Sequence, residues 1–191
     1  MSEKLLKAIN EIITLTDAES EEVLSAFEYF QLPKKQHWIK EGTHCQHIAF
    51  VKSGSMRMFY LDHNGNEVTC FFAGENSFLT LYSSFLTNSL AHETITSIED
   101  TELLIIEKKV LEKLSASIPK IEIFRRFMAE HFFMILENRI RMMQSEKAEA
   151  RYEIFIKEHP ELLSTIPLHH TASFLGITPQ HLSRLRKNRS K

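Results

Sequence analysis

The five glycines of this chain are distributed unevenly, and their positions constrain the fold more than any other feature of its 191 residues. Four lie between residues 42 and 74, and the fifth is Gly176. Between residues 38 and 106, turn residues separate short apolar runs at intervals of about 9 to 12 positions, which is typical of an antiparallel sandwich or barrel. We therefore expect a β region over residues 38–106, with helical structure on both sides of it.

The sequence FYLDHNGNEVTCFF, residues 59–72, carries the clearest local signal in the β region. Asn64 and Gly65 lie between two strand-like runs, and both residue types tolerate the positive φ that a tight hairpin turn requires. We expect a β-hairpin here. Before the β region, Thr16 and Glu19 have the spacing of a capping box, which predicts that a helix leads into the sheet.

Residues 120–145 contain neither glycine nor proline, which predicts a helix longer than the average of about 11–12 residues. Its apolar residues form more than one stripe, and a helix that is apolar on two sides needs two partners. We expect one partner to be its own domain and the other to be a second copy of the chain; the alternative is a core helix inside a monomer. The predicted dimer interface consists of Phe124, Met128, Phe132, Ile135, Leu136 and Ile140.

The sequence LHHTASFLGITPQHLSRLRK, residues 168–187, has the pattern of two helices joined by a tight turn. Gly176 supplies the conformation that ends the first helix and redirects the chain. Thr178 is a good N-cap for the second helix, and Pro179 suits its first position, where a missing N–H costs nothing. Leu182 and Leu185 would bury one side of that helix. This is the pattern of a helix-turn-helix.

Charge is also distributed unevenly, although the net charge is only −2. The last acidic residue is Glu161, and the charged residues after it are all basic: Arg184, Arg186, Lys187, Arg189 and Lys191. A local basic patch can bind a polyanion when the whole protein is nearly neutral.

With its leucines inward, the second helix presents polar and basic side chains to the outside. We expect Gln180 and Arg184 to read base edges, because their side chains can form two hydrogen bonds with adenine and guanine. Contacts to the DNA backbone are expected from Thr178, Ser183, Arg186 and Lys187. On the first helix, His169 and His170 are expected to face phosphate or solvent. The alternative is a helical hairpin with a solvated basic tail.

On these residues the chain resembles the Crp/Fnr family of bacterial transcription regulators. The resemblance covers nearly the whole length: the lead-in helices, the run WIKEGTHCQHIAFVKSGSMRMFYLDHNGNEVTCFFAGE, the long helix, and most specifically ASFLGITPQHLSRLRK. It implies an α+β chain with a cyclic-nucleotide-binding-like β-roll, a long dimerisation helix and a C-terminal helix-turn-helix of winged-helix type. One departure is Pro179, which stands where some members have a base-reading arginine, so their operators do not transfer to this chain.

The expected organisation has three parts. Residues 1–116 form the sensor-like β-roll domain with its lead-in helices, residues 117–144 the dimerisation helix, and residues 145–191 the helix-turn-helix domain. The resemblance further implies double-stranded DNA and a second copy of the chain as partners, with RNA polymerase as a candidate.

The family members that bind cyclic AMP hold its ribose with a Gly-Glu pair and its phosphate with an arginine followed by a small residue. Here Phe78 and Leu79 match the first pair, and Ala91 and His92 match the second. No lysine or arginine occurs between Arg57 and Lys108, and a buried phosphate without a cation is costly. We expect that the chain does not bind cyclic AMP in the usual manner and that it needs no cofactor.

Two alternatives remain open for the interior of the roll. Its residues either line a pocket for an apolar or neutral effector or simply fill the roll. The candidate pocket residues are Phe72, Phe78, Leu79, Leu81, Tyr82, Phe85, Ala91 and His92.

Other chemistry has little support in the sequence. His44, Cys45 and His47 lie close together, but a four-coordinate structural metal site needs more ligands than are found nearby. The two cysteines, at positions 45 and 70, supply neither a disulfide framework nor an iron–sulfur cluster. No P-loop, GxGxxG motif or catalytic triad order is present, and we expect no enzyme activity.

The segment at the N-terminus is too charged for a signal peptide, and no run approaches the roughly 20 apolar residues of a membrane span. We expect a cytoplasmic homodimer that regulates transcription without membrane contact. The rival hypotheses are a small-molecule sensor acting through protein contacts and a haem or metal sensor using His44, Cys45 or His47.

Overall fold

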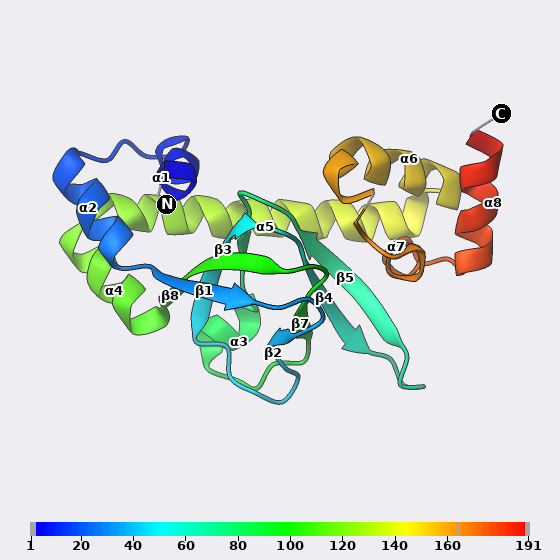
Figure 1. Cartoon of the computed structure of the whole chain (residues 1–191), viewed down its shortest axis with the longest axis horizontal. Coiled ribbons are helices and arrows are strands. Elements are labelled where there is room, and N and C mark those ends of the chain that lie inside the picture. The colour runs from blue at the N-terminus through cyan, green and yellow to red at the C-terminus, as the bar shows by residue number, and fades with distance from the viewer. Residues whose placement is uncertain (1–2, 164, 190–191) are drawn as a thin grey trace.

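The structure is a computed structural model that describes residues 3–163 and 165–189. A long helix, α5 (Lys120–Ser145), runs along the molecule, and the β-roll lies against its side (Figure 1). Helices gather at both ends of α5. At one end these are α1 (Glu3–Asn10), α2 (Asp17–Ser25) and α4 (Lys108–Ser117); at the other they are α6 (Ala148–Glu158), α7 (Leu168–Phe174) and α8 (Pro179–Arg189).

The β-roll consists of two four-stranded antiparallel sheets, with the short helix α3 (Tyr82–Thr87) beside them. The first sheet has the order β1 (Glu28–Leu32), β8 (Thr101–Glu107), β3 (His47–Ser53) and β6 (Phe78–Leu79). The second has the order β2 (His37–Ile39), β7 (Thr94–Ser97), β4 (Met56–Leu61) and β5 (Glu67–Ala73). Strand β5 is therefore an edge strand of the second sheet, as is β2.

The predicted hairpin is confirmed as β4–β5, which pairs Leu61 with Glu67. Gly65 has a φ of +79°, and the turn closes through a hydrogen bond from the Asp62 amide to the Asn66 carbonyl. The predicted capping box is confirmed too. The Glu19 amide donates to the Thr16 hydroxyl at 3.3 Å, and the Thr16 amide donates to the Glu19 carboxylate at 2.7 Å.

Two hydrophobic clusters hold the molecule together. The larger one fills the roll and includes residues of α1, α4 and the first half of α5, among them Leu5, Phe50 and Phe124. The smaller one forms the core of the helix-turn-helix unit, and it also contains Phe72 and Ile98 from the β-roll. The two parts therefore share buried apolar residues, and the roll is packed directly against the helical unit.

The predicted α+β architecture is confirmed, but the described residues after Ser145 form only helices and turns. A β-wing, which the winged-helix type would add, is not among them. The connection between α6 and α7 contains Pro160 and Pro167 and forms a 3₁₀ helix over Pro160–Leu163. Proline cannot donate to a strand ladder, so this connection is unsuited to a hairpin. No helix in the described ranges is long and apolar enough to cross a membrane.

Candidate nucleic-acid interface

The turn between α7 and α8 has the geometry that the sequence predicted. Gly176 has a φ of +66°, and two hydrogen bonds close the end of α7. The Ile177 amide donates to the Ala172 carbonyl at 3.0 Å, and the Gly176 amide donates to the Ser173 carbonyl at 3.1 Å. This pair of bonds defines a Schellman motif, which satisfies carbonyl groups at a helix end and redirects the chain.

Helix α8 begins after a capped turn. The His181 amide donates to the Thr178 hydroxyl at 3.2 Å, and Pro179 occupies the first helical position. Leu182 is 1% exposed in the smaller hydrophobic cluster, and Leu185 packs beside it. The apolar side of α8 is thus anchored, which fixes the direction of its opposite side.

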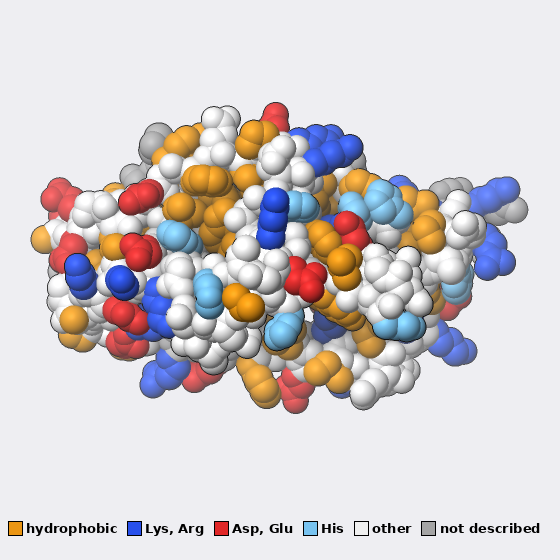
Figure 2. Space-filling view, turned by 90° about the horizontal axis from the view of Figure 1, so that it is seen from below, with side chains coloured by type: hydrophobic (Ala, Val, Ile, Leu, Met, Phe, Trp, Pro, Cys, Tyr) orange, Lys and Arg blue, Asp and Glu red, His pale blue; other side chains and the backbone are white. Residues whose placement is uncertain are grey.

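The side chains predicted to contact DNA all lie on the outside of this unit. Figure 2 shows lysine and arginine side chains projecting at the end of the molecule where α8 lies. Neither Arg184 nor Lys187 forms an ion pair with a described carboxylate, so both remain available to an external anion. The Arg189 side chain and Lys191, also named above as basic, lie outside what the structure describes. The exposed predicted residues are Thr178, Gln180, Ser183, Arg184, Arg186 and Lys187.

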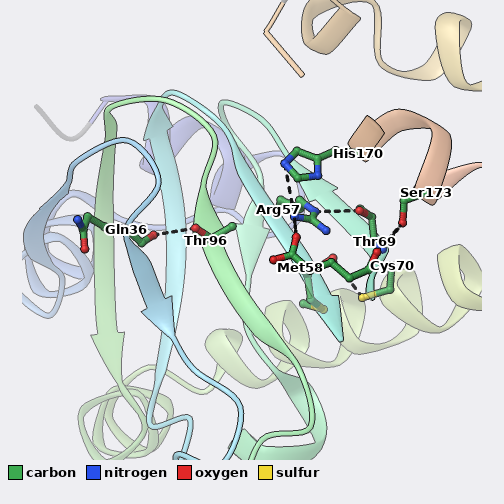
Figure 3. A network of polar contacts seen from close by, with 9 residues as sticks. Gln36, Arg57, Met58, Thr69, Cys70, Thr96, His170 and Ser173 are labelled. Atoms are coloured by element: carbon green, nitrogen blue, oxygen red, sulfur yellow. Dashed lines mark hydrogen bonds and ion pairs between the residues drawn. The ribbon is translucent and has the colours of Figure 1, made fainter. Parts of the chain in front are cut away.

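Helix α7 is docked on the open edge of β5 (Figure 3). The Thr69 amide donates to the Ser173 hydroxyl at 2.9 Å, and that hydroxyl donates to the Glu67 carbonyl at 3.1 Å. Arg139 of α5 donates to the carbonyls of Thr69 and Phe174, at 3.2 and 3.1 Å. An edge strand has unpaired backbone groups, and here side chains of α5 and α7 satisfy them.

Arg57 lies beneath α7 and is 2% exposed. Its Nε donates to the Thr69 hydroxyl at 2.8 Å, and its Nη1 contacts the Glu67 carboxylate at 2.6 Å. The same Nη1 lies 3.4 Å from Nε2 of His170, while Nη2 has no acceptor among the described residues. Burial lowers the pKa of Arg57, and the ion pair with Glu67 opposes that change.

The prediction for the two histidines of α7 is wrong for His170. Neighbouring residues on a helix point about 100° apart, so His169 and His170 cannot face the same side. His169 is exposed, whereas His170 points toward the roll and Arg57. Burial lowers the pKa of His170 to about 4, and Arg57 and His169 act in the same direction.

The predicted dimer residues occupy different environments on α5. Leu136 and Ile140 are 55% and 59% exposed. Met128, Phe132 and Ile135 are half-buried against the roll or the helical unit. Phe124 requires a correction: it is 9% exposed and packs on Phe78 in the larger cluster, so it belongs to the core of its own roll.

The exposed apolar stripe combines Leu136 and Ile140 of the predicted interface with three residues that sequence reasoning left out of it. Ala129, Phe133, Leu136, Ile140 and Met143 are exposed and follow one another at alternating intervals of four and three positions. This is the spacing of a coiled-coil seam. We call these five residues the α5 seam. Phe133 is 68% exposed.

A cavity of about 230 Å³ lies between the roll, α3 and α5. Of the predicted effector residues it brings together Phe78, Leu79, Tyr82 and Phe85. The others lie elsewhere. Leu81 and Ala91 are buried in the larger cluster, Phe72 packs on Phe155 and Phe174 in the smaller one, and His92 is exposed.

Sequence reasoning missed the cations of this cavity because it considered only the chain between Arg57 and Lys108. Arg125 and Arg126 of α5 also line the cavity. Arg125 is bound to Ser115 and to Glu122, whereas Arg126 is largely exposed and lies 3.8 Å from Glu130. The helical period of residues 120–145 could have indicated this, because Arg125 follows the buried Ile121 by four positions and so lies on the same side of the helix.

The candidate metal residues do not form a cluster. Cys45 is fully buried, and its thiol lies 3.4 Å from the His47 carbonyl and 3.3 Å from the Thr80 hydroxyl. Within residues 3–163 and 165–189, no three His, Cys, Asp or Glu side chains are placed to hold a metal ion.

The roll matches the family model described as the cyclic nucleotide-binding domain, over residues 29–117. The matched segment extends from β1 to the end of α4 and so covers both sheets of the roll. A sequence comparison with curated proteins gave no significant match.

Solved structures extend the likeness beyond the cyclic nucleotide-binding domain. FixK2 from Bradyrhizobium japonicum has a TM-score of 0.75 at 17% identity, over 85% of this chain and 83% of its own. A Eubacterium rectale protein described as a Crp/Fnr transcriptional regulator has a TM-score of 0.69 at 18% identity, over 91% and 83%. The catabolite activator protein of Thermus thermophilus has a TM-score of 0.59 at 21% identity, over 96% and 86%. The chain has the fold of the Crp/Fnr regulators.

Proposed function

We propose that this chain is a DNA-binding transcription regulator of the Crp/Fnr type that binds a two-fold symmetric operator as a homodimer. The observation that carries the proposal is α8, an exposed basic helix with a capped start, held outward by a buried leucine face and a glycine turn. A helix presented in this way fits the major groove of B-DNA, which is about 12 Å wide.

Dimerisation through the α5 seam supports the same proposal. An exposed apolar stripe of this length on a soluble protein marks an interaction surface. The heptad-like spacing of the stripe favours a second α5 helix as the partner. Two copies related by a two-fold axis along this seam would carry two α8 helices, as a two-fold symmetric operator requires.

We further propose that the cyclic nucleotide-binding domain does not hold cyclic AMP in the usual manner. Phe78 and Leu79 are buried beside the 230 Å³ cavity, and Ala91 offers no charge to a phosphate. The cations nearest that cavity come from α5, and Arg125 is already paired with Glu122. An apolar or neutral effector remains the better match for this cavity.

The test of the proposal is selection of bound DNA from a random pool, followed by affinity measurements on variants. Arg184→Ala should weaken binding by about 1–3 kcal/mol and relax the preference at one position of each half-site, because a bidentate base contact is lost. Lys187→Ala should weaken binding to all sequences alike and reduce the salt slope by about one unit.

Lys113→Ala is the control for charge, since Lys113 is exposed on α4 at the other end of the molecule. It should leave both affinity and site preference unchanged. Recovery of no preferred sequence, or equal effects of the three substitutions, would contradict the proposal.

A further inference from the structure

A second cavity lies at the junction of the roll and the helix-turn-helix unit. Its volume is about 510 Å³, within the range of about 300–1,000 Å³ that is usual for small-molecule sites. Its walls come from the end of β5, α5, helix α6 and the end of α7, and Leu136 and Met143 of the α5 seam lie at its margin. It is therefore distinct from the cavity between the roll and α3 described above.

The walls of this junction cavity are mainly apolar and aromatic. Phe71 and Phe72 contribute from β5, Phe155 from α6 and Phe174 from α7, while Met142 lines it from α5. Aromatic rings and a flexible thioether accommodate a flat or extended apolar body well. Such a ligand would fill the space between these side chains and contact them from inside the cavity.

Two arginines lie in the same walls. Arg139 donates to the carbonyls of Thr69 and Phe174, and its guanidinium lies 4.1 Å from the centre of the Phe174 ring. Arg151 donates from Nε to the Leu175 carbonyl at 3.0 Å and from Nη1 to the Glu146 carbonyl at 2.6 Å. Both side chains are half-buried, and each bonds to backbone rather than to a counter-charge.

None of the ion pairs among the described residues involves Arg139 or Arg151. Glu75 and Glu158 also line the cavity, but both are exposed, and Glu75 is paired with Lys4 at 2.9 Å. Burial lowers the pKa of Arg139, and Arg151 contributes in the same direction. The junction cavity therefore combines mainly apolar walls with two guanidinium groups that form no ion pair among the described residues.

We propose that the junction cavity binds a small organic anion with an aromatic or extended apolar body, such as an aromatic carboxylate. The acidic group would pair with Arg139 and Arg151, and the apolar body would lie among the phenylalanine rings and Met142. A charge-assisted hydrogen bond to arginine is stronger than a neutral one, which accounts for the preference for an anion. This inference does not depend on DNA binding.

The experiment uses two fluorescent probes of similar shape on the full chain. 8-Anilinonaphthalene-1-sulfonate carries an anionic group, whereas N-phenyl-1-naphthylamine has the same ring system without it. The wild-type protein should bind the anionic probe about ten- to hundredfold more tightly than the neutral one, which is the range for a hydrogen bond to a charged group.

Three variants locate the binding. Arg139→Gln should remove most of the preference for the anionic probe, because half of the cationic pair is lost. Met142→Trp keeps every charge but places a bulky ring system in the cavity, and it should weaken both probes at least about tenfold by steric exclusion. Arg141→Gln is the matched control on the same helix, since Arg141 is exposed and outside the cavity, and it should bind both probes as the wild type does.

Circular dichroism and thermal unfolding establish that each variant is folded, and Met142→Trp carries the test if Arg139→Gln does not fold. Unchanged binding of both probes to Met142→Trp would place them elsewhere, on the exposed α5 seam for example, and would overturn the proposal. Equal affinity of the wild type for the two probes would overturn it as well.

Discussion

At the scale of single residues, the direction of α8 depends on one backbone conformation, that of Gly176. Its φ of +66° is costly for residues with a Cβ atom, by about 1–2 kcal/mol. A Cβ at this position would also lie 2.6 Å from the terminal methyl group of Met143, the last residue of the α5 seam. The glycine thus permits the turn, and the flexible end of the Met143 side chain can move away from an added Cβ at little cost.

We predict that Gly176→Ala lowers the free energy of unfolding by about 1–2 kcal/mol or more, measured by urea denaturation. Gly65→Ala is the matched control, because Gly65 has a φ of +79° with open space around its missing Cβ. Gly65→Ala should lower the free energy of unfolding only by the cost of a positive φ in a residue with a Cβ atom. Equal losses in the two variants would mean that the contact with Met143 contributes nothing.

His170 predicts a pH dependence of stability. Its pKa is lowered to about 4 in the folded chain, whereas an unfolded histidine titrates near 6.5. Below about pH 6.5 the unfolded chain takes up a proton that the folded chain does not, so stability falls as the pH decreases toward 4. Above about pH 6.5 His170 is neutral in both the folded and the unfolded chain, so this loss of stability is absent.

The measurement compares unfolding free energies of the wild type and His170→Asn between pH 4 and 7. Relative to this variant, the wild type should gain stability as the pH rises, since the variant lacks the titrating group. His169→Asn, at the exposed neighbouring position, should follow the wild-type curve. Parallel curves for the wild type and His170→Asn would refute the assignment.

At the scale of elements, the contact between β5 and α7 links the β-roll to the helix-turn-helix unit. Ser173 replaces a neighbouring strand by accepting from the Thr69 amide and donating to the Glu67 carbonyl. The ring of Phe71 lies 6.0 Å from that of Phe132 on α5. Strand β5 is thus in contact with both the long helix and the helix-turn-helix.

We predict that Ser173→Ala lowers the free energy of unfolding by about 1 kcal/mol, because two backbone groups lose their partner. Hydrogen exchange should report the change locally, as faster exchange of the Thr69 amide. Ser183→Ala, at an exposed position on α8, should leave that amide unaffected. Unchanged exchange at Thr69 in Ser173→Ala would show that the docked edge is held by other contacts.

At the scale of the whole molecule, α5 spans the roll at one end and the helical unit at the other (Figure 1). Its inner residues Ile121, Phe124 and Met128 belong to the larger hydrophobic cluster, so its outer stripe is not needed for the fold of one chain. The α5 seam therefore predicts the oligomeric state.

We expect the wild type to sediment as a dimer and Ile140→Glu as a monomer, because a charge placed in an apolar seam would be buried without a partner. Met134→Glu is the matched control. Met134 is 55% exposed but lies on a different side of α5 from the seam, so its variant should remain dimeric. Dissociation by both substitutions, or by neither, would contradict the predicted seam.

The amino-acid sequence alone determined the local features of this protein: the Gly176 turn, the Thr178 cap, the β4–β5 hairpin and the capping box at Thr16. Each depends on residues within about six positions of one another, whose backbone preferences act in any tertiary setting. The resemblance of nearly the whole chain to one family added the β-roll and the order of the domains.

Only the tertiary structure decided which sides of these elements meet. It placed Phe124 in the core and Phe133 on the surface, turned His170 toward Arg57, and brought Arg139 and Arg151 into one cavity. The sequence of α5 has several apolar stripes, and it does not show which of them is buried, because burial depends on neighbours far away in the sequence. Contacts of that kind arise from packing, and packing is decided by the three-dimensional fit of whole elements.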